Sequence, residues 1–280
     1  MTGKTIVLTG ASDGIGAAAA RQLVTDGHTV ALVGRSKKKT EALAHELNAD
    51  FFVADFTRFS EVRALAERLK DSYPRIDVLI NNAGGIFGDR ARTVDGFEKT
   101  LQVNHLAPFL LTNLLMETLT ASNASIINTS SVAARIFGKI NLDDLNNERK
   151  YSANKAYGDA KLANILFTKE LDRRFSGQGI SAVAFHPGNV QTSFASDTTS
   201  VMRFIYQTPL GRLAGLISPE QSALHLVWLT EGTPGREWVS GEYYEKQKIA
   251  KTNPQAADAQ LAVGLWDKSA ELVGISTTAL

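Results

Sequence analysis

Residues 5–16 read Thr5-Ile-Val-Leu-Thr-Gly10-Ala-Ser12-Asp13-Gly14-Ile15-Gly16. The apolar run predicts a short strand, the glycines predict a tight turn, and the alanines that follow predict a helix. A helix N-terminus binds a pyrophosphate when the backbone comes close, which requires positions without side chains. The spacing is GxxxGxG rather than GxGxxG, and a glycine turn by itself is as often structural. Because this turn joins a strand to a helix at the first βα unit, we interpret it as a nucleotide-binding turn.

The rest of the chain continues the alternation of strands and helices. Short apolar runs that predict strands recur at 28–33, 51–54, 77–80, 125–129 and 180–185, with an edge strand expected at 238–244 and a tail helix at 261–272. This order is typical of an α/β fold, a single Rossmann-type doubly wound parallel sheet of about seven strands with helices on both faces. We find no repeat, low-complexity tract or linker, so we expect residues 1–280 to form one domain.

Composition excludes several classes of function. The chain has 280 residues and is 44% hydrophobic, enough for a sizeable core, and its net charge of +1 gives no electrostatic case for nucleic acid. Cysteine is absent, which excludes disulfides, thiol catalysis and thiolate metal sites, and we expect no metal. The N-terminus runs directly into a strand, which predicts neither signal peptide nor anchor helix. We therefore expect a soluble, cytoplasmic protein.

The end of the second strand bears on the choice of nucleotide. A nucleotide that lacks a 2′-phosphate is usually held by an acidic residue here, whereas a phosphate favours Arg or Lys. Gly34 and Arg35 occupy these positions, which favours NADP and leaves NAD possible. The alternative is that Arg35 belongs to a solvated loop, and Asp13 adds an opposing negative charge. After the third strand, Asp55 either contacts an adenine or caps the helix that begins at 57–61.

Polar residues follow the fourth and fifth strands. The run Asn81-Asn82-Ala83-Gly84 suits the nucleotide side of a parallel sheet, although the two amides could instead tie neighbouring strands together. Asn104 lies in an apolar helical stretch, where it either hydrogen-bonds backbone in a kinked helix or holds a water. The fifth strand is followed by Ser130 and Ser131, and residues 134–156 are polar and are expected to be irregular.

Tyr157-Gly-Asp-Ala-Lys161 begins an apolar-periodic helix. Residues four apart lie on one helix face, so Tyr157 and Lys161 are expected to be neighbours. A phenol has a reference pKa of about 10, and bringing it to about 7 takes roughly 4 kcal/mol. An ammonium group ~4 Å away in a partly buried site supplies about that much. Alone, the pair is weak evidence, because Tyr and Lys on one helix face usually only pack there.

Together these residues resemble the short-chain dehydrogenase/reductase family over essentially the whole chain. The matching elements are TGxxxGxG at 9–16, Asp55, NNAG at 81–84, Asn104, Ser131, the Tyr157–Lys161 pair and Pro187-Gly188. Residues 101–106, 109–112 and 161–168 and the long stretch between Ser131 and Tyr157 are similar to the branch of retinol dehydrogenases, protochlorophyllide reductase and WW-domain oxidoreductase. Tyr151-Ser-Ala-Asn-Lys155 is a second YxxxK; Tyr157 is preferred because it leads into the apolar helix, and Ser131 is preferred to Ser130.

The resemblance implies an NAD(P)-dependent oxidoreductase. Ser131 would orient the substrate oxygen, Tyr157 would transfer the proton, Lys161 would lower the tyrosine pKa and hold the nicotinamide ribose, and Asn104 would position a water. The expected cofactor-binding residues are Gly10, Ser12, Asp13, Gly14, Ile15, Gly16, Arg35, Asp55, Phe56, Asn82, Ala83, Gly84, Tyr157, Lys161, Pro187, Gly188, Val190 and Thr192. The reaction would transfer a hydride between NADP, or NAD, and a lipophilic ketone, aldehyde or alcohol.

Residues 189–217 are apolar and interrupted by Gly and Pro, and we expect them to form a substrate-side lid. The competing interpretation is a surface helix at 196–217 that touches a partner or a membrane. The family suggests a homodimer or homotetramer. Two alternative functions on the same fold are a catalytically silent nucleotide-sensing regulator and a sugar-nucleotide epimerase. The regulator is disfavoured because Ser131, Tyr157, Lys161 and Asn104 are all present.

Overall fold

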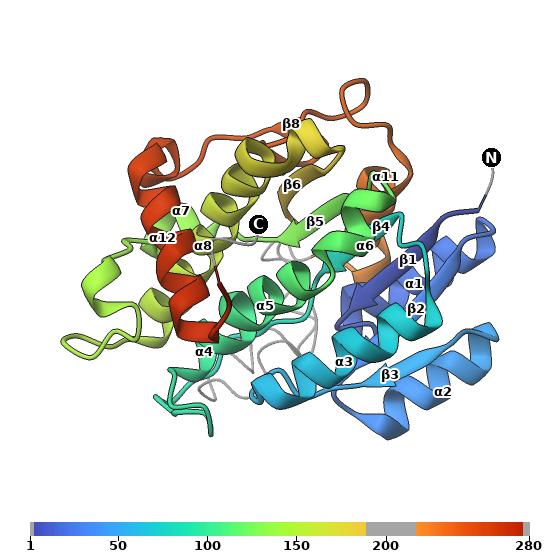
Figure 1. Ribbon diagram of the computed structural model, residues 1–280, viewed down its shortest axis with the longest axis horizontal. Helices are drawn as coiled ribbons and strands as arrows, with labels where there is room; N and C mark the ends of the chain where they lie inside the picture. Colours follow the sequence, from blue (N-terminus) through green and yellow to red (C-terminus); the bar gives the residue numbers. More distant parts are fainter. Residues whose placement is uncertain (1–2, 189–216, 277–280) are drawn as a thin grey trace.

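A computed structural model describes residues 3–188 and 217–276. Within them one sheet has the strand order β3-β2-β1-β4-β5-β6-β7-β8 (Figure 1). The strands are β1 (Thr5–Thr9), β2 (Thr29–Gly34), β3 (Phe51–Val53), β4 (Val78–Asn81), β5 (Ser125–Thr129), β6 (Ser181–His186), β7 (Tyr243–Glu245) and β8 (Lys248–Ile249). Every neighbouring pair is parallel except β7 and β8. The predicted doubly wound parallel sheet is confirmed, with one strand more than expected.

Helices cover both faces of this sheet because its strands alternate their side chains between two buried sides. Ile6 and Leu8 of β1 pack in one core, under α1 (Gly14–Thr25), α2 (Lys37–Leu47) and α11 (Pro219–Glu231). Val7 points to the opposite core, with α3 (Phe59–Ser72), α5 (Ala107–Leu114) and part of α8 (Ala153–Phe175). The continuous apolar runs of the sequence therefore correspond to strands that are buried on both faces.

The remaining helical elements are short, apart from the last helix. They are α4 (Lys99–Leu101), the π-helix η1 (Gln102–Leu106), α6 (Met116–Ala121), α7 (Ala133–Phe137), η2 (Leu142–Asp144), η3 (Ser176–Gln178), η5 (Pro254–Ala257) and α12 (Ala259–Val273). In Figure 1, α12 lies beside α8, and the two helices are in contact. Because α4, η1 and α5 follow each other without a break, they form one helical segment with a π turn inside it.

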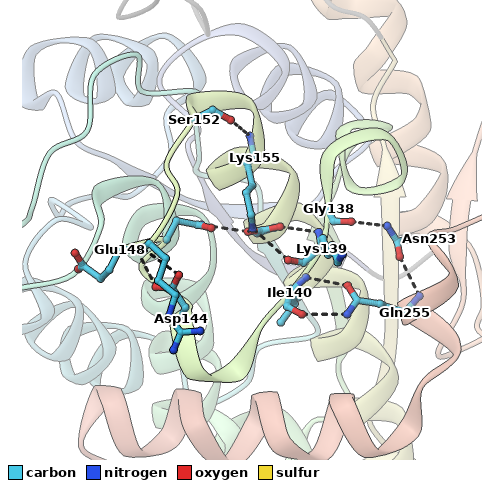
Figure 2. A network of polar contacts seen from close by, with 12 residues as sticks. Gly138, Lys139, Ile140, Asp144, Glu148, Ser152, Lys155, Asn253 and Gln255 are labelled. Atoms are coloured by element: carbon cyan, nitrogen blue, oxygen red, sulfur yellow. Dashed lines mark hydrogen bonds and ion pairs between the residues drawn. The ribbon is translucent and has the colours of Figure 1, made fainter.

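The stretch 134–156 is more ordered than its polar sequence suggests. It contains most of α7, the turn η2 and the start of α8, which Ser152 caps by accepting a hydrogen bond from the Lys155 backbone. Figure 2 shows how it is held: the Asn253 amide donates to the Gly138 carbonyl, and Gln255 bonds both backbone groups of Ile140. The prediction of an irregular stretch was wrong in this part, because these partners lie more than a hundred residues away.

The sheet also ends differently from the prediction. The expected edge strand at 238–244 is reduced to β7, and β8 is the edge. The turn between β7 and β8 uses Lys246 and Gln247 at positive φ. Such a turn is normally signalled by Asn-Gly or Asp-Gly, and the absence of that signal explains why the hairpin was not predicted. The strands at both edges are short: three residues in β3 and two in β8.

The expected lid at 189–217 falls outside the described residues except for Ile217. The alternative of a helix at 196–217 that touches a partner or a membrane also falls outside the described residues. In residues 3–188 and 217–276, none of the helices combines the length and the apolar character that crossing a bilayer requires. The same residues contain no cluster of three or more His, Asp or Glu side chains arranged to hold a metal ion.

Candidate active site

A cavity of about 680 Å³ opens at the carboxyl ends of the central strands. This is the edge of a doubly wound sheet where ligands bind. The predicted residues that line it are Gly10, Ser12, Asp13, Gly14, Ile15, Gly16, Arg35, Asp55, Phe56, Asn82, Ala83, Gly84, Ser131, Tyr157, Lys161, Pro187 and Gly188. Val190 and Thr192 lie outside the described residues. Asn104 does not line the cavity but bonds to Gly85, which does.

The glycine turn brings the backbone close to the next strand end. Gly10 has a φ of +66°, and a Cβ there would lie 2.8 Å from the Ala83 Cα. A Cβ on Gly16 would lie 2.1 Å from the Gly10 carbonyl oxygen. Larger residues cannot be accommodated at these two positions without moving the backbone, so the turn packs closely against the end of β4. The N-terminus of α1 lies at the cavity, where the Asp13 carboxylate caps it by accepting from the Gly14 backbone. This geometry matches the demand of a pyrophosphate.

The end of β2 supplies positive charge to the same cavity. Arg35 and Lys39 line it, and Arg35 is exposed. Asp13, whose negative charge opposed the preference for a phosphate, lies 2.7 Å from the Lys39 ammonium in an ion pair. Its charge is therefore compensated by a residue that the sequence argument did not assign. The sequence shows Lys39 only as part of the lysine run 37–39, and the local pattern does not indicate which of these lysines lines the cavity.

Asp55 lines the cavity, and its hydrogen bonds test the alternative that it caps the helix after β3. Asp55 accepts a hydrogen bond from the Thr57 backbone, whereas α3 begins at Phe59, whose backbone N–H donates to Asp95. The alternative that Asp55 caps this helix is wrong, because a carboxylate distant in sequence takes that position.

The asparagines after β4 do tie strands together. The Asn81 amide donates to the Asn128 side chain at 2.9 Å. The Asn82 amide donates to the Thr9 carbonyl at 3.0 Å. Because Asn82 also lines the cavity, its two interpretations hold together: it cross-links β1 and β4 and presents a polar surface to whatever binds there.

The sequence offers two candidate catalytic serines, Ser130 and Ser131, and two candidate tyrosine–lysine pairs. The Ser130 hydroxyl donates to the Lys161 carbonyl at 2.7 Å and thereby anchors β5 to α8. Ser131 also lines the cavity, where its oxygen accepts from the Ala133 backbone. Tyr157 and Lys161 both line the cavity, but Tyr151 and Lys155 do not. Lys155 forms an ion pair with Asp159 in the network of Figure 2.

Lys161 is 1% exposed and reaches the cavity from α8. Its Nζ donates to the Thr129 carbonyl at 3.1 Å and lies 5.5 Å from the centroid of the Tyr157 ring. Burial lowers the pKa of Lys161 to about 7. The protein therefore holds this lysine where a bound hydrogen-bond acceptor would shift it toward the charged form.

Asn104 lies in the π turn η1 and is fully buried. Its amide donates to the carbonyls of Gly85 and Thr100, and its oxygen accepts from the Gly85 backbone at 3.1 Å. The sequence alternative of an Asn that bonds backbone in a distorted helix is what the structure shows. A Cβ on Gly84 would lie 2.4 Å from the Asn104 oxygen and 3.2 Å from the Lys161 Nζ. Asn104 and Lys161 are thus packed around the same glycine.

Several lining residues were not predicted. Ile136 and Phe137 of α7 are 60% and 44% exposed, and Ile86, Phe87 and Val103 add apolar surface on the facing segments. Asn154, one turn before Tyr157 on α8, and His186 also line the cavity. The only signal for Ile136 and Phe137 was a pair of apolar residues in a polar stretch. It became informative once α7 was seen beside Tyr157.

Comparisons with known proteins agree with this geometry. Residues 4–202 match the family described as short chain dehydrogenase. The chain is 42% identical to a protein of Streptomyces sp. (strain C5) provisionally named daunorubicin C-13 ketoreductase, over 98% of this chain and 94% of the relative. It is 40% identical to retinol dehydrogenase 13 of Homo sapiens, over 98% of this chain and 85% of the relative.

A solved structure supports the same assignment. The crystal structure of an uncharacterized protein from Mycobacterium paratuberculosis superposes with a TM-score of 0.78 at 33% sequence identity, covering 98% of this chain and 95% of the other. Fold, site geometry and sequence similarity lead to one conclusion. The chain belongs to the short-chain dehydrogenase family of NAD(P)-dependent oxidoreductases, in its retinol dehydrogenase branch.

Proposed function

We propose that the protein transfers a hydride between NADP and a lipophilic ketone, aldehyde or alcohol. The observation that carries this proposal is the layout of the cavity. One continuous space is lined by the glycine turn and Arg35, by Tyr157 and Lys161, and by the apolar side chains of α7. Such a cavity provides for an anionic nucleotide, for proton transfer and for a carbon-rich substrate.

The nucleotide end fits the 2′-phosphorylated cofactor. A pyrophosphate suits the N-terminus of α1 after the glycine turn, and a 2′-phosphate suits a guanidinium at the end of β2. Arg35 lines this end, and Asp13 is neutralised by Lys39. A competing carboxylate is therefore already compensated. When bound, the nicotinamide supplies or accepts the hydride.

The residues of this chain would handle the proton and the substrate oxygen. Ser131 would donate a hydrogen bond to that oxygen and orient it. Tyr157 would give the proton in reduction and take it in oxidation. Lys161 would hold the ribose hydroxyls and, when charged, favour the phenolate. Asn104 would hold the loop at Gly85 in place around this group, since its amide bonds that loop on both sides.

The substrate end favours apolar molecules. Ile136 and Phe137 leave apolar surface exposed at the cavity, which is costly unless something covers it. The names of the relatives point to retinol and daunorubicin, both large and carbon-rich. Asn154 is the one unassigned amide of α8 among the described lining residues. It would meet a polar group of the substrate.

Cofactor titration tests the nucleotide half of the proposal. Binding of NADPH and NADH is measured by fluorescence on the wild type, on Arg35→Ala and on Lys38→Ala. Lys38 is exposed in the first turn of α2, three residues after Arg35, but does not line the cavity. We expect the wild type to prefer NADPH and Arg35→Ala to lose roughly tenfold or more of that preference, the effect of one charge-assisted hydrogen bond. Lys38→Ala should bind as the wild type does.

Equal binding of both nucleotides, or a preference for NADH, would refute the role of Arg35. Binding of neither nucleotide would refute the nucleotide half of the proposal. The cofactor that binds is then used to screen ketones and aldehydes, with Tyr157→Phe as the variant expected to be inactive. A Tyr157→Phe variant that binds cofactor and keeps wild-type turnover would remove Tyr157 from the mechanism.

A homodimer or homotetramer, a single domain over 1–280 and a cytoplasmic location stay predictions. Light scattering after size-exclusion chromatography measures the first, and limited proteolysis followed by mass spectrometry measures the second. Cell fractionation of the full chain addresses the third. None of them changes the assignment of the cavity.

A further inference from the structure

A buried row of polar side chains connects the last helix to Lys161. It begins on α12 with Ser269, whose hydroxyl lies 2.9 Å from His105 Nε2. His105 Nδ1 lies 3.4 Å from the Asn164 amide oxygen, and the Asn164 amide nitrogen donates to the Thr129 carbonyl at 3.1 Å. The same carbonyl accepts from the Lys161 Nζ at 3.1 Å. All four side chains are almost completely buried.

The directions of these hydrogen bonds follow from chemistry. Asn164 must present its NH₂ group to Thr129, because a carbonyl only accepts, so the amide oxygen faces His105. His105 then carries its proton on Nδ1, and Nε2 accepts from the Ser269 hydroxyl. Burial lowers the pKa of His105 to about 4. The ring is therefore neutral at physiological pH, and this arrangement leaves neither ring nitrogen without a partner.

The packing around the row restricts its movement. The His105 ring lies 6.1 Å from the rings of both Phe109 and Phe167, edge-on to the latter. His105 belongs to the π turn η1 next to Asn104, and Asn164 belongs to α8, one turn after Lys161. The row thus connects α12 and η1 to α8, and its end on α8 bonds the carbonyl at the end of β5.

We propose that Asn164 and His105 are positioning residues for Lys161 and act through the carbonyl of Thr129. The inference rests on the role proposed above for that lysine. A carbonyl oxygen has two lone pairs, and here one serves the Asn164 amide and the other the Lys161 Nζ. The amide fixes the direction of the oxygen and also competes for its negative charge. It therefore opposes the ammonium form of the lysine.

This role makes a signed prediction for the free protein. Removing the amide in Asn164→Leu leaves the Thr129 oxygen to Lys161 alone, and the pKa of Lys161 should rise by roughly 0.5 to 1 unit. His105→Leu should shift it in the same direction by less, because the amide loses the partner that orients it. His105→Gln can still donate to Asn164 and accept from Ser269, and it should titrate as the wild type does.

The experiment is an NMR titration of protein with isotope-labelled lysine side chains, without cofactor or substrate. The Lys161 signal is the one that disappears in Lys161→Met, and it is followed from about pH 5.5 to 9. Thermal unfolding of each variant is measured in parallel. Because no cofactor is present, a failed cofactor assay would leave this result standing, and an unchanged titration would leave the proposed reaction standing.

An upward shift in the two leucine variants and its absence in His105→Gln support the proposal. If the pKa of Lys161 is the same in all variants and only their stability is lowered, the row merely satisfies buried polar groups. That result would overturn the proposal. Should Asn164→Leu not fold, the pair His105→Leu and His105→Gln decides by the same criterion. Ser269→Ala, which removes a single hydroxyl, adds a milder variant at the far end of the row.

Discussion

Replacing Lys161 by Met should change how stability depends on pH. The Lys161 side chain is 1% exposed, and its Nζ donates a hydrogen bond to the Thr129 carbonyl. Burial, without contribution from a charged neighbour among the described residues, lowers its pKa from 10.5 to about 7. Methionine keeps a similar length and apolar stem but cannot be charged. The variant therefore isolates the electrostatic cost of placing an amine at this position.

The magnitude follows from the two pKa values. Between pH 7 and about pH 10.5 the unfolded chain binds a proton at this lysine that the folded chain does not, so the free energy of unfolding rises with pH. With about 1.4 kcal/mol per pKa unit, the wild type should gain roughly 2 kcal/mol from pH 7 to pH 9 through Lys161 alone. Below pH 7 both states are protonated, and the full penalty, on the order of 5 kcal/mol, is present.

Urea unfolding at pH 6, 7, 8 and 9 measures this dependence for the wild type and Lys161→Met. Other groups titrate in both proteins, so the quantity of interest is the difference in unfolding free energy between them. It should favour the variant and shrink by roughly 2 kcal/mol from pH 7 to 9. Lys169→Met, a change of a half-buried lysine on the same helix, is the control. A difference that stays constant over this range would refute the reasoning, since it would mean that Lys161 is not held near neutrality.

Three further predictions concern single contacts. Gly84→Ala places a Cβ 2.4 Å from the Asn104 oxygen, so it should lower the free energy of unfolding in urea by about 1–3 kcal/mol and abolish most of the turnover. Gly177→Ala, with open space around it, is the control and should leave the stability unchanged. Equal stabilities of the two variants would show that the structure around Gly84 adjusts easily to a methyl group. Asp159→Ala removes the carboxylate that bonds the Lys139 backbone and the Lys155 ammonium in the stretch shown in Figure 2. We expect the free energy of unfolding to fall by about 1–3 kcal/mol and proteolytic cleavage within 138–152 to occur earlier. An unchanged digestion pattern would contradict this role. Ile136→Ser should raise the KM for decanal by roughly three- to tenfold and leave the KM for propanal and the melting temperature unchanged. Equal changes in KM for both aldehydes would show that α7 does not contact the apolar part of the substrate.

Much of the fold could be predicted because its signals are local. Parallel strands buried on both faces produce continuous apolar runs, and these identified β1 to β6 to within a residue or two. The glycine turn is also local, since Gly10 and Gly16 are needed where the backbone passes close to another segment. The same holds for Tyr157 and Lys161, whose spacing on one helix places both at the cavity.

The features that were missed depend on partners distant in sequence. The order in 138–152 depends on Asn253 and Gln255, more than a hundred residues away, and no pattern within the stretch indicates them. His105 gave no signal at all, because its function depends on Asn164 and on Ser269 of a helix that comes last in the chain. Local periodicity reports which face of an element is buried, but not which element covers it.

The two short edges of the sheet have a consequence for behaviour at high concentration. An edge strand exposes backbone groups that can recruit a second chain, and short strands flanked by charge resist this. β3 presents three residues, and β8 presents two between Lys246 and Lys251, with Lys248 within it. A foreign strand would find too few backbone partners at either end and would have to approach several ammonium groups at one of them. We therefore expect concentrated solutions of the folded protein to resist fibril formation, so that aggregation on heating should follow global unfolding rather than precede it.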